Sequence, residues 1–147
     1  MADSFETYRG MVYPWHIDHV GHMNVQFYTA RFDEASWHFL LRLGFAPGKL
    51  KDDNRAFVAA QQQTQYFAEV MAGALLHVES ELLEVKSRTL KYVHRMFNSE
   101  SNVLVATMEL VIIYLDTVAR RAAPLPETTQ LANAKPATEP GISADAA

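Results

Sequence analysis

The stretch NVQFYTARFDEASWHFLLRL, residues 24–43, decides the fold class because it is the one long segment with a sustained helical pattern. Asn24 is a residue type that caps helix N-termini, and Gly44 stands where a glycine commonly ends a helix. We therefore expect one long amphipathic helix over residues 24–43. Its apolar residues recur at intervals of three and four: Val25, Tyr28, Phe32, Ala35, Phe39 and Leu43.

The chain on both sides of this helix has the pattern of β-strands. One strand is expected over residues 5–13, where Pro14 ends it. The others are expected at 56–68, 75–86, 88–98 and 103–118, and short turns between consecutive strands indicate antiparallel pairing. One helix and one antiparallel sheet bury each other's apolar faces. The expected fold is therefore α+β, with a five-stranded antiparallel sheet wrapped around one central helix.

Length and composition indicate a single domain with an ordinary hydrophobic core. The chain has 147 residues, of which 49% are hydrophobic, and it contains no cysteine. Disulfides, thiolate catalysis and cysteine-based zinc sites are therefore excluded. From residue 123 onward the sequence is mainly Pro, Ala, Thr and Glu, which cannot bury enough surface to order itself. We expect a folded domain within residues 1–122 and a disordered tail over 123–147.

The charge and the apolar pattern argue against two classes of partner. The net charge is -4, whereas nucleic-acid binding needs clustered Lys and Arg, so we expect no nucleic-acid partner. The longest apolar stretch, Val103 to Val118, is interrupted by Thr107, Glu109 and Asp116 and is too short to span a bilayer. The N-terminal residues lack the pattern of a signal peptide. We expect a cytoplasmic protein without a membrane segment.

The densest group of polar residues lies just before the predicted helix, in PWHIDHVGHMN, residues 14–24. A helix N-terminus presents unpaired backbone N–H groups and a partial positive charge, which can hold a carbonyl oxygen that becomes an oxyanion. A carboxylate beside it can attack that carbonyl or activate water. Asp18, followed by the Gly21 turn and the helix start, has these parts in the required order.

This motif resembles the signature of the 4-hydroxybenzoyl-CoA thioesterase-like branch of the hot-dog-fold superfamily. The resemblance rests on Asp18-His19-Val20-Gly21-His22-Met23-Asn24, on Tyr28, and on the aromatic, acidic and alanine residues Phe32-Asp33-Glu34-Ala35. The Gly-His-Met-Asn variant is also similar to acyl-carrier-protein thioesterase-like members. With the strand pattern, the resemblance covers about residues 5–122.

The resemblance implies a function and a set of site residues. It implies hydrolysis of an acyl-CoA thioester, with Asp18 as nucleophile or general base and a backbone N–H near Val25 polarising the carbonyl. It implies a homodimer joined edge to edge through its sheets, or a homotetramer, and no metal or organic cofactor. Tyr28, seven residues after Gly21, is carried over as a substrate-binding residue, although its helical spacing favours core packing.

Other candidate residues have a structural and a functional interpretation each. His22 and Asn24 are candidate catalytic residues for positioning substrate or water, or structural hydrogen-bonding groups, with Asn24 as helix cap. The resemblance makes Gln63 and Thr64, on a strand expected at the centre of the sheet, candidates for a contact from the partner subunit, but surface polar residues are the favoured interpretation. Arg88 and Arg95, with Lys86 and Lys91, are candidates for the coenzyme A phosphates or form a solvated sheet edge.

The sequence also departs from the aromatic-acyl members of the family and leaves other functions open. His16 stands where those members carry a first Asp, and Val25 replaces a common second Asn.

Asp18 alone suits an ordinary Asx-turn. The histidines of the loop suit a metal-dependent hydrolase or oxygenase. A thioesterase acting on acyl carrier protein and a non-catalytic acyl-binding module are the remaining alternatives.

Overall fold

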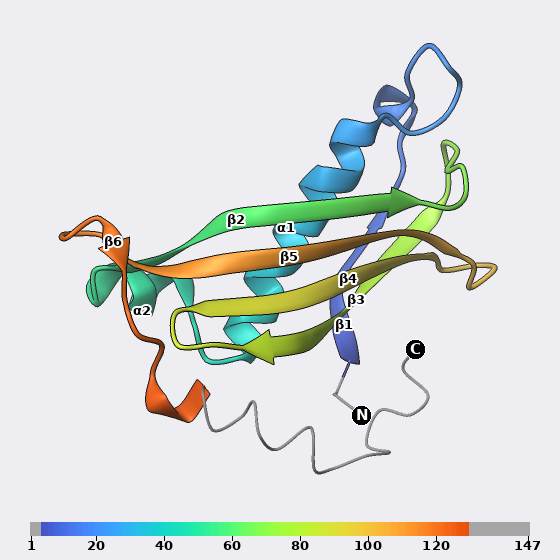
Figure 1. Cartoon of the computed structure of the whole chain (residues 1–147). Helices are drawn as coiled ribbons and strands as arrows, with labels where there is room; N and C mark the ends of the chain where they lie inside the picture. The colour runs from blue at the N-terminus through green and yellow to red at the C-terminus, as the bar shows by residue number, and fades with distance from the viewer. Residues whose placement is uncertain (1–3, 130–147) are drawn as a thin grey trace.

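A computed structural model describes residues 4–129 of the chain. One curled antiparallel sheet holds one long helix against one of its faces (Figure 1). The strands are β1 (Ser4–Met11), β2 (Arg55–Tyr66), β3 (Leu75–Val85), β4 (Thr89–Asn98), β5 (Leu104–Asp116) and β6 (Arg121–Ala122). The helices are η1 (Pro14–His16, a single 3-10 turn), α1 (Val25–Arg42) and α2 (Pro47–Asp52).

The long helix and the five long strands match the elements expected from the sequence, within one to two residues at most ends. Asn24 caps α1, because its side-chain oxygen accepts a hydrogen bond from the backbone N–H of Gln26. Gly44 has a φ of 98°, which L side chains rarely adopt, and it ends the helix as predicted. The buried face of α1 consists of Tyr28, Arg31, Phe32, Ala35, Ser36, Phe39 and Leu40.

The strand order differs from the order along the chain. The sheet runs β1-β3-β4-β5-β2, with all neighbours antiparallel and β6 paired to β5. β2 and β3 follow each other in sequence but have β4 and β5 between them in the sheet, so the connection over residues 67–74 is not a hairpin. Its Val70 is 1% exposed and accepts a hydrogen bond from the backbone N–H of Met23.

This order corrects one expectation about β2. The strand that carries Gln63 and Thr64 lies at the edge of the sheet within the subunit and not at its centre. Apolar patterning distinguishes strand from helix, but it does not fix which strands become neighbours.

The ordered chain also extends beyond the predicted boundary at residue 122. Ala123 and Leu125 are 5% and 3% exposed, and the backbone N–H of Ala123 donates to Tyr114. The prediction of disorder from residue 123 onward is therefore wrong for 123–129, because two apolar residues in a Pro-rich segment suffice to cover the end of the core. Residues 130–147 lie outside the described part. The short elements α2 and β6 were not expected from the sequence.

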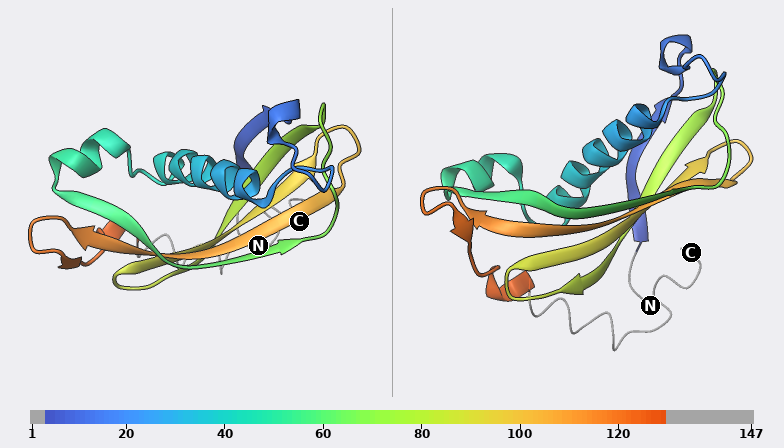
Figure 2. Two further views of the ribbon diagram at one scale, coloured as in Figure 1. Left: turned by 90° about the horizontal axis from the view of Figure 1, so that it is seen from above. Right: turned by 45° about the horizontal axis from the view of Figure 1, so that its top comes forward.

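The core lies between α1 and the face of the sheet that curls around it (Figure 2). Alternate residues of the central strands point toward the helix, as the two-residue period of a strand requires. On β4 these are Leu90, Tyr92, His94 and Met96, each no more than 1% exposed. Among residues 4–129, no helix is both long and apolar enough to cross a membrane.

Candidate active site

The polar loop before α1 folds into a compact turn. Its first residues form η1, and a tight turn follows in which the backbone N–H of Gly21 donates to the carbonyl of Asp18 at 3.0 Å. Gly21 has a φ of 102°, so a residue with a side chain would be strained there. A bridge between Ile17 and Met23 closes the loop, and Met23 is fully buried. The loop is therefore a defined scaffold for Asp18.

The carboxylate of Asp18 accepts two hydrogen bonds from this scaffold. The backbone N–H of Val20 donates to Oδ1 at 2.9 Å, and the side-chain amide of Asn24 donates to Oδ2 at 2.9 Å. The Asn24 and Val20 donors, with smaller contributions from His19 and His22, hold the pKa of Asp18 below its ordinary value. Asp18 is thus ionised at neutral pH, as a nucleophile or a general base must be. The Val20 contact is also the Asx-turn of the structural interpretation.

Asn24 joins this carboxylate to the start of α1. Its Oδ1 caps the helix while its Nδ2 donates to Asp18, so a single amide fixes the position of the carboxylate relative to the helix N-terminus. The next residue, Val25, is 58% exposed, and its backbone N–H has no hydrogen-bond acceptor among residues 4–129. An ionised carboxylate and an available helix N–H therefore lie within one short segment.

His22 and Tyr28 lie beside a cavity of about 270 Å³ next to this helix start. Its wall joins the loop and α1 to the end of β2 and the residues that follow it. His22 Nε2 lies 3.9 Å from Glu69 Oε2, and the ring of Tyr28 packs edge-on against Tyr66. The lining residues are His22, Met23, Val25, Tyr28, Tyr66, Phe67, Ala68 and Glu69. The cavity therefore lies directly beside the start of α1, at Val25.

The two candidates on β2 point to opposite faces of the sheet. Gln63 is exposed and borders a cavity of about 100 Å³ with Lys91 and Glu109, away from α1. Thr64 is half-buried and alternates with it, so it faces the side of α1. Within one subunit, the structure does not bring Gln63 to the loop of Asp18.

The basic residues that were expected to form one patch do not gather in the structure. On the sheet face opposite α1, Arg95 pairs with Glu81 at 2.8 Å and Lys91 pairs with Glu109 at 3.6 Å. Arg88 is exposed in the turn between β3 and β4, which lies at the far end of the sheet from the loop that precedes α1 (Figure 1). The structure therefore does not gather Arg88 and Arg95 into one site beside Asp18.

The histidines of the loop point to different surroundings. His16 Nδ1 accepts a hydrogen bond from the backbone N–H of Tyr13, while His22 faces Glu69. Burial, and then the nearby Arg31, lower the pKa of His16. Within residues 4–129, no group of three or more Asp, Glu or His side chains is arranged to hold a metal ion.

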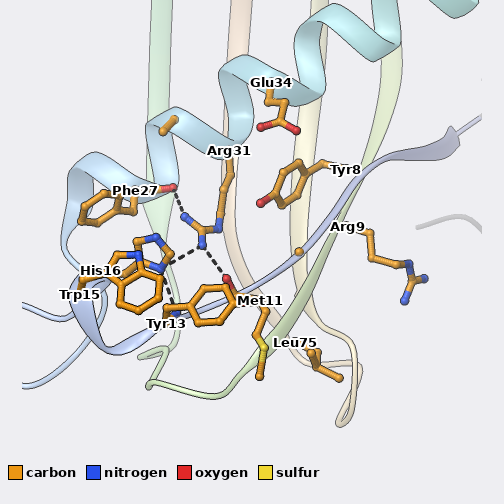
Figure 3. Close-up of a pocket in the computed structure, with 12 residues that line it drawn as sticks. Tyr8, Arg9, Met11, Tyr13, Trp15, His16, Phe27, Arg31, Glu34 and Leu75 are labelled. Carbon is orange, nitrogen blue, oxygen red and sulfur yellow. Dashed lines mark hydrogen bonds between the residues drawn. The ribbon is translucent and has the colours of Figure 1, made fainter.

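Sequence reasoning missed a larger cavity of about 810 Å³ on the β1 side of α1 (Figure 3). Arg31 of α1 lies at its base and is only 6% exposed. The signal in the sequence was a charged residue directly before Phe32, within the stretch that buries its apolar side chains. The lining residues are Tyr8, Arg9, Gly10, Met11, Tyr13, Trp15, His16, Phe27, Ala30, Arg31, Glu34 and Leu75.

Known proteins with similar sequences are thioesterases. The chain is 29% identical over 110 residues to an L-carnitine dehydrogenase/betainyl-CoA thioesterase of Agrobacterium fabrum, a match that covers 75% of this chain but 22% of that protein. The chain thus spans about a fifth of that relative. It is 23% identical over 101 residues to the acyl-CoA thioester hydrolase YbgC of Escherichia coli, covering 69% of this chain and 75% of that protein.

Solved structures share the fold at low sequence identity. A Staphylococcus aureus protein in complex with CoA superposes with a TM-score of 0.83 at 20% identity, covering 97% of this chain and 89% of the other. A 1,4-dihydroxy-2-naphthoyl-CoA thioesterase from Synechocystis superposes with a TM-score of 0.76 at 20% identity, covering 90% and 96%. The model of the thioesterase-like superfamily matches residues 12–132. The expected hot-dog fold is confirmed, and the chain belongs to the thioesterase-like superfamily.

Proposed function

We propose that this protein hydrolyses acyl-CoA thioesters to the free acid and coenzyme A. The observation that carries the proposal is the junction of loop and helix, where Asn24 binds the ionised carboxylate of Asp18 and caps the helix that begins at Val25. Its relatives include enzymes of this reaction class.

The chemistry follows from these two groups. The thioester carbonyl accepts a hydrogen bond from the Val25 N–H, which stabilises the negative charge that develops on its oxygen. Asp18 then removes a proton from water that attacks the carbonyl carbon, or it attacks that carbon itself and forms an anhydride that water cleaves. In both routes the carbon–sulfur bond breaks, coenzyme A leaves as the thiolate, and the proton given up by the attacking water converts it to the thiol.

We also propose a homodimer that joins two sheets through β2, with a tetramer as the alternative. β2 has 12 residues and carries one charged residue, Arg55, and within residues 4–129 it pairs on one side with β5. A long edge strand with few charges invites pairing with another strand. The mass of the particle by light scattering tests this: twice or four times the 16.6 kDa of the chain supports it, and a monomer contradicts it.

The direct test of the activity is thiol release from a panel of acyl-CoAs with short, medium, long and aromatic acyl groups. A thiol-reactive dye can be used throughout because the chain has no cysteine of its own. Wild type and Asp18→Asn are run side by side, each with and without a chelator. We expect turnover that survives the chelator and is lost in the variant.

Three results would contradict this proposal. An Asp18→Asn protein with wild-type turnover would exclude Asp18 as the reacting carboxylate. Turnover lost with chelator would favour a metal at the loop histidines. No release from any acyl-CoA would favour a carrier-protein substrate or a non-catalytic acyl-binding module.

A further inference from the structure

The lining of the cavity of about 810 Å³ includes a buried positive charge, the guanidinium of Arg31 (Figure 3). The guanidinium of Arg31 donates to the carbonyl oxygens of Met11 and Phe27, at 2.9 and 3.2 Å, and its Nη2 lies 3.4 Å from His16 Nδ1. Its Nε has no hydrogen-bond acceptor among the described residues, and no Asp or Glu among them forms an ion pair with it. Buried arginines usually have an anionic partner.

The other charges of the cavity leave this cation uncompensated. Arg9 also lines the cavity but is already paired with Glu6 at 2.7 Å. Glu34 is the one acidic residue of the lining and makes no ion pair with Arg31. His16 accepts at Nδ1, so in its neutral form it carries its proton on Nε2 and offers a donor. The base of the cavity therefore favours an anion.

An aromatic surface lies next to this cation. The rings of Tyr13 and Trp15 are stacked in parallel, with centroids 4.7 Å apart and 2° between their planes. Trp15 is 71% exposed and Tyr13 is 42% exposed, so the stack is open to another flat ring. Stacking on an aromatic side chain is a common way to bind a nucleic-acid base, worth about 1–3 kcal/mol in nucleic-acid complexes.

The cavity adjoins the candidate active site. The carbonyl of His16, in the wall of the cavity, accepts a hydrogen bond from the backbone N–H of Asn24, which holds Asp18. On α1, the lining residues Phe27, Ala30 and Arg31 lie on a different face from Val25 and Tyr28, which line the smaller cavity. A thioester at the helix start would thus have one cavity on each side.

We propose that the larger cavity binds the nucleotide end of coenzyme A, with the adenine stacked on Trp15 and a phosphate drawn to Arg31. This proposal rests on the proposed acyl-CoA hydrolysis and assigns the phosphates to a place other than Arg88 and Arg95. The smaller cavity then receives the acyl group. The size of the larger cavity, about 810 Å³, is within the range of sites for ligands as large as a nucleotide.

The first test uses the two tryptophans of the chain, Trp15 and Trp37. Trp37→Phe leaves Trp15 as the sole tryptophan, and Trp15→Phe leaves Trp37. Each protein is titrated with coenzyme A and, separately, with its adenosine bisphosphate fragment. We expect both ligands to quench the fluorescence of the protein that keeps Trp15 and to leave that of the other unchanged. Quenching of Trp37 alone, or of neither, would overturn the proposal.

The second test compares Arg31→Met with Arg88→Met as the matched control. Calorimetry with coenzyme A should give a dissociation constant about tenfold weaker for Arg31→Met and unchanged for Arg88→Met. Since a buried position is altered, circular dichroism must first show that Arg31→Met is folded. Trp15→Ala removes the exposed stacking surface without touching the core, and it should weaken binding as well if Arg31→Met fails to fold. Weaker binding in Arg88→Met alone would overturn the proposal.

The kinetics separate this site from the catalytic one. With acyl-CoA, Trp15→Ala should raise KM and leave kcat nearly unchanged, because the nucleotide lies away from the reacting bond. With acyl-pantetheine, which lacks the nucleotide, wild type and variant should have the same kcat/KM. Coenzyme A binding at Trp15 in a protein without turnover would reject the hydrolysis and keep the site, whereas turnover without a response of Trp15 would reject the site alone.

Discussion

Two hydrogen-bonded networks of this protein lie in opposite environments, one at the surface and one in the core. At the surface, Asp18 accepts from Asn24 and from the backbone of Val20. In the core, His94 lies between Ser80, 2.6 Å from Nδ1, and Ser36, 2.9 Å from Nε2. Thr7 and Tyr92 extend the core network, through Ser80 and Ser36 respectively.

The environments set opposite charge states. Asp18 is stabilised in its ionised form by donors at the edge of solvent. His94 is 0% exposed, stacks on Phe32 and is surrounded by hydroxyl groups, so burial lowers its pKa to about 3 and keeps it neutral. A histidine so placed has no contact with solvent. We infer that the core network specifies packing and that the loop network performs chemistry.

The largest effect should separate activity from stability at Asp18. Asp18→Asn retains an oxygen for the Val20 N–H but loses the negative charge, so we expect turnover to fall by about a hundredfold or more. The free energy of unfolding, from urea denaturation, should change by less than about 1 kcal/mol. Asp53→Asn, at an exposed ion pair with Lys49, is the control and should keep full turnover. Equal losses in both variants would contradict the assignment.

A substitution in the core network should lower stability and leave activity nearly unchanged, the reverse of the effect expected at Asp18. His94→Ala leaves Ser36 and Ser80 without their shared partner and opens a cavity, so we expect a loss of about 3 kcal/mol of unfolding free energy. His38→Ala, at an exposed position of α1, should cost less than about 0.5 kcal/mol. At temperatures where His94→Ala is folded, its kcat should stay near wild type. A large loss of kcat in the folded variant would place His94 in the catalytic machinery.

The pH dependence of stability should report on His94. Its pKa is about 3 when folded and about 6.5 when unfolded, so between these values the unfolded chain binds the extra proton and stability falls as the pH falls. Lowering the pH from 7 to 5 should reduce the free energy of unfolding by about 2 kcal/mol through this single group. Urea denaturation at both pH values measures it, with His94→Gln as comparison. The same pH dependence in both proteins would show that other groups cause it.

The smallest effect should distinguish the two roles of Asn24, the cap of α1 and the hydrogen bond to Asp18. Asn24→Ser keeps a capping oxygen but loses the amide that donates to Asp18, whereas Asn24→Ala loses both. In both variants the pKa of Asp18 should rise toward its ordinary value, so the acid limb of the pH–rate profile moves to higher pH. Only Asn24→Ala should also lose about 1 kcal/mol of stability. An unshifted acid limb in both would mean that Asn24 does not tune Asp18.

The sequence predicted the elements of the fold well because the relevant signals are local. The spacing of apolar residues located α1, and Asn24 and Gly44 marked its ends as the structure has them. Strand pairing was predicted less well, because the place of β2 at the edge depends on its pairing with β5, a segment far from it in sequence.

The same contrast between local signals and contacts across the fold applies to the candidate site. Asp18, Gly21 and Asn24 lie within seven residues of one another, so their pattern could be read from the chain, and the structure joins Asp18 and Asn24 directly. Arg88 and Arg95 are close in sequence, but one lies in a turn and the other pairs with Glu81 across the sheet. Proximity along a strand does not bring side chains to one site.

The sequence by itself thus determined the fold class, the helix and its caps, and the loop that presents Asp18, since each depends on periodicity or on neighbours in the chain. Only the tertiary structure decided the strand order, the burial of His94 and Arg31, and the two cavities beside the start of α1. These depend on contacts between residues far apart in sequence, such as Arg31 with Met11 and His94 with Ser36. The burial that sets charge state and ligand access exists only when those segments meet.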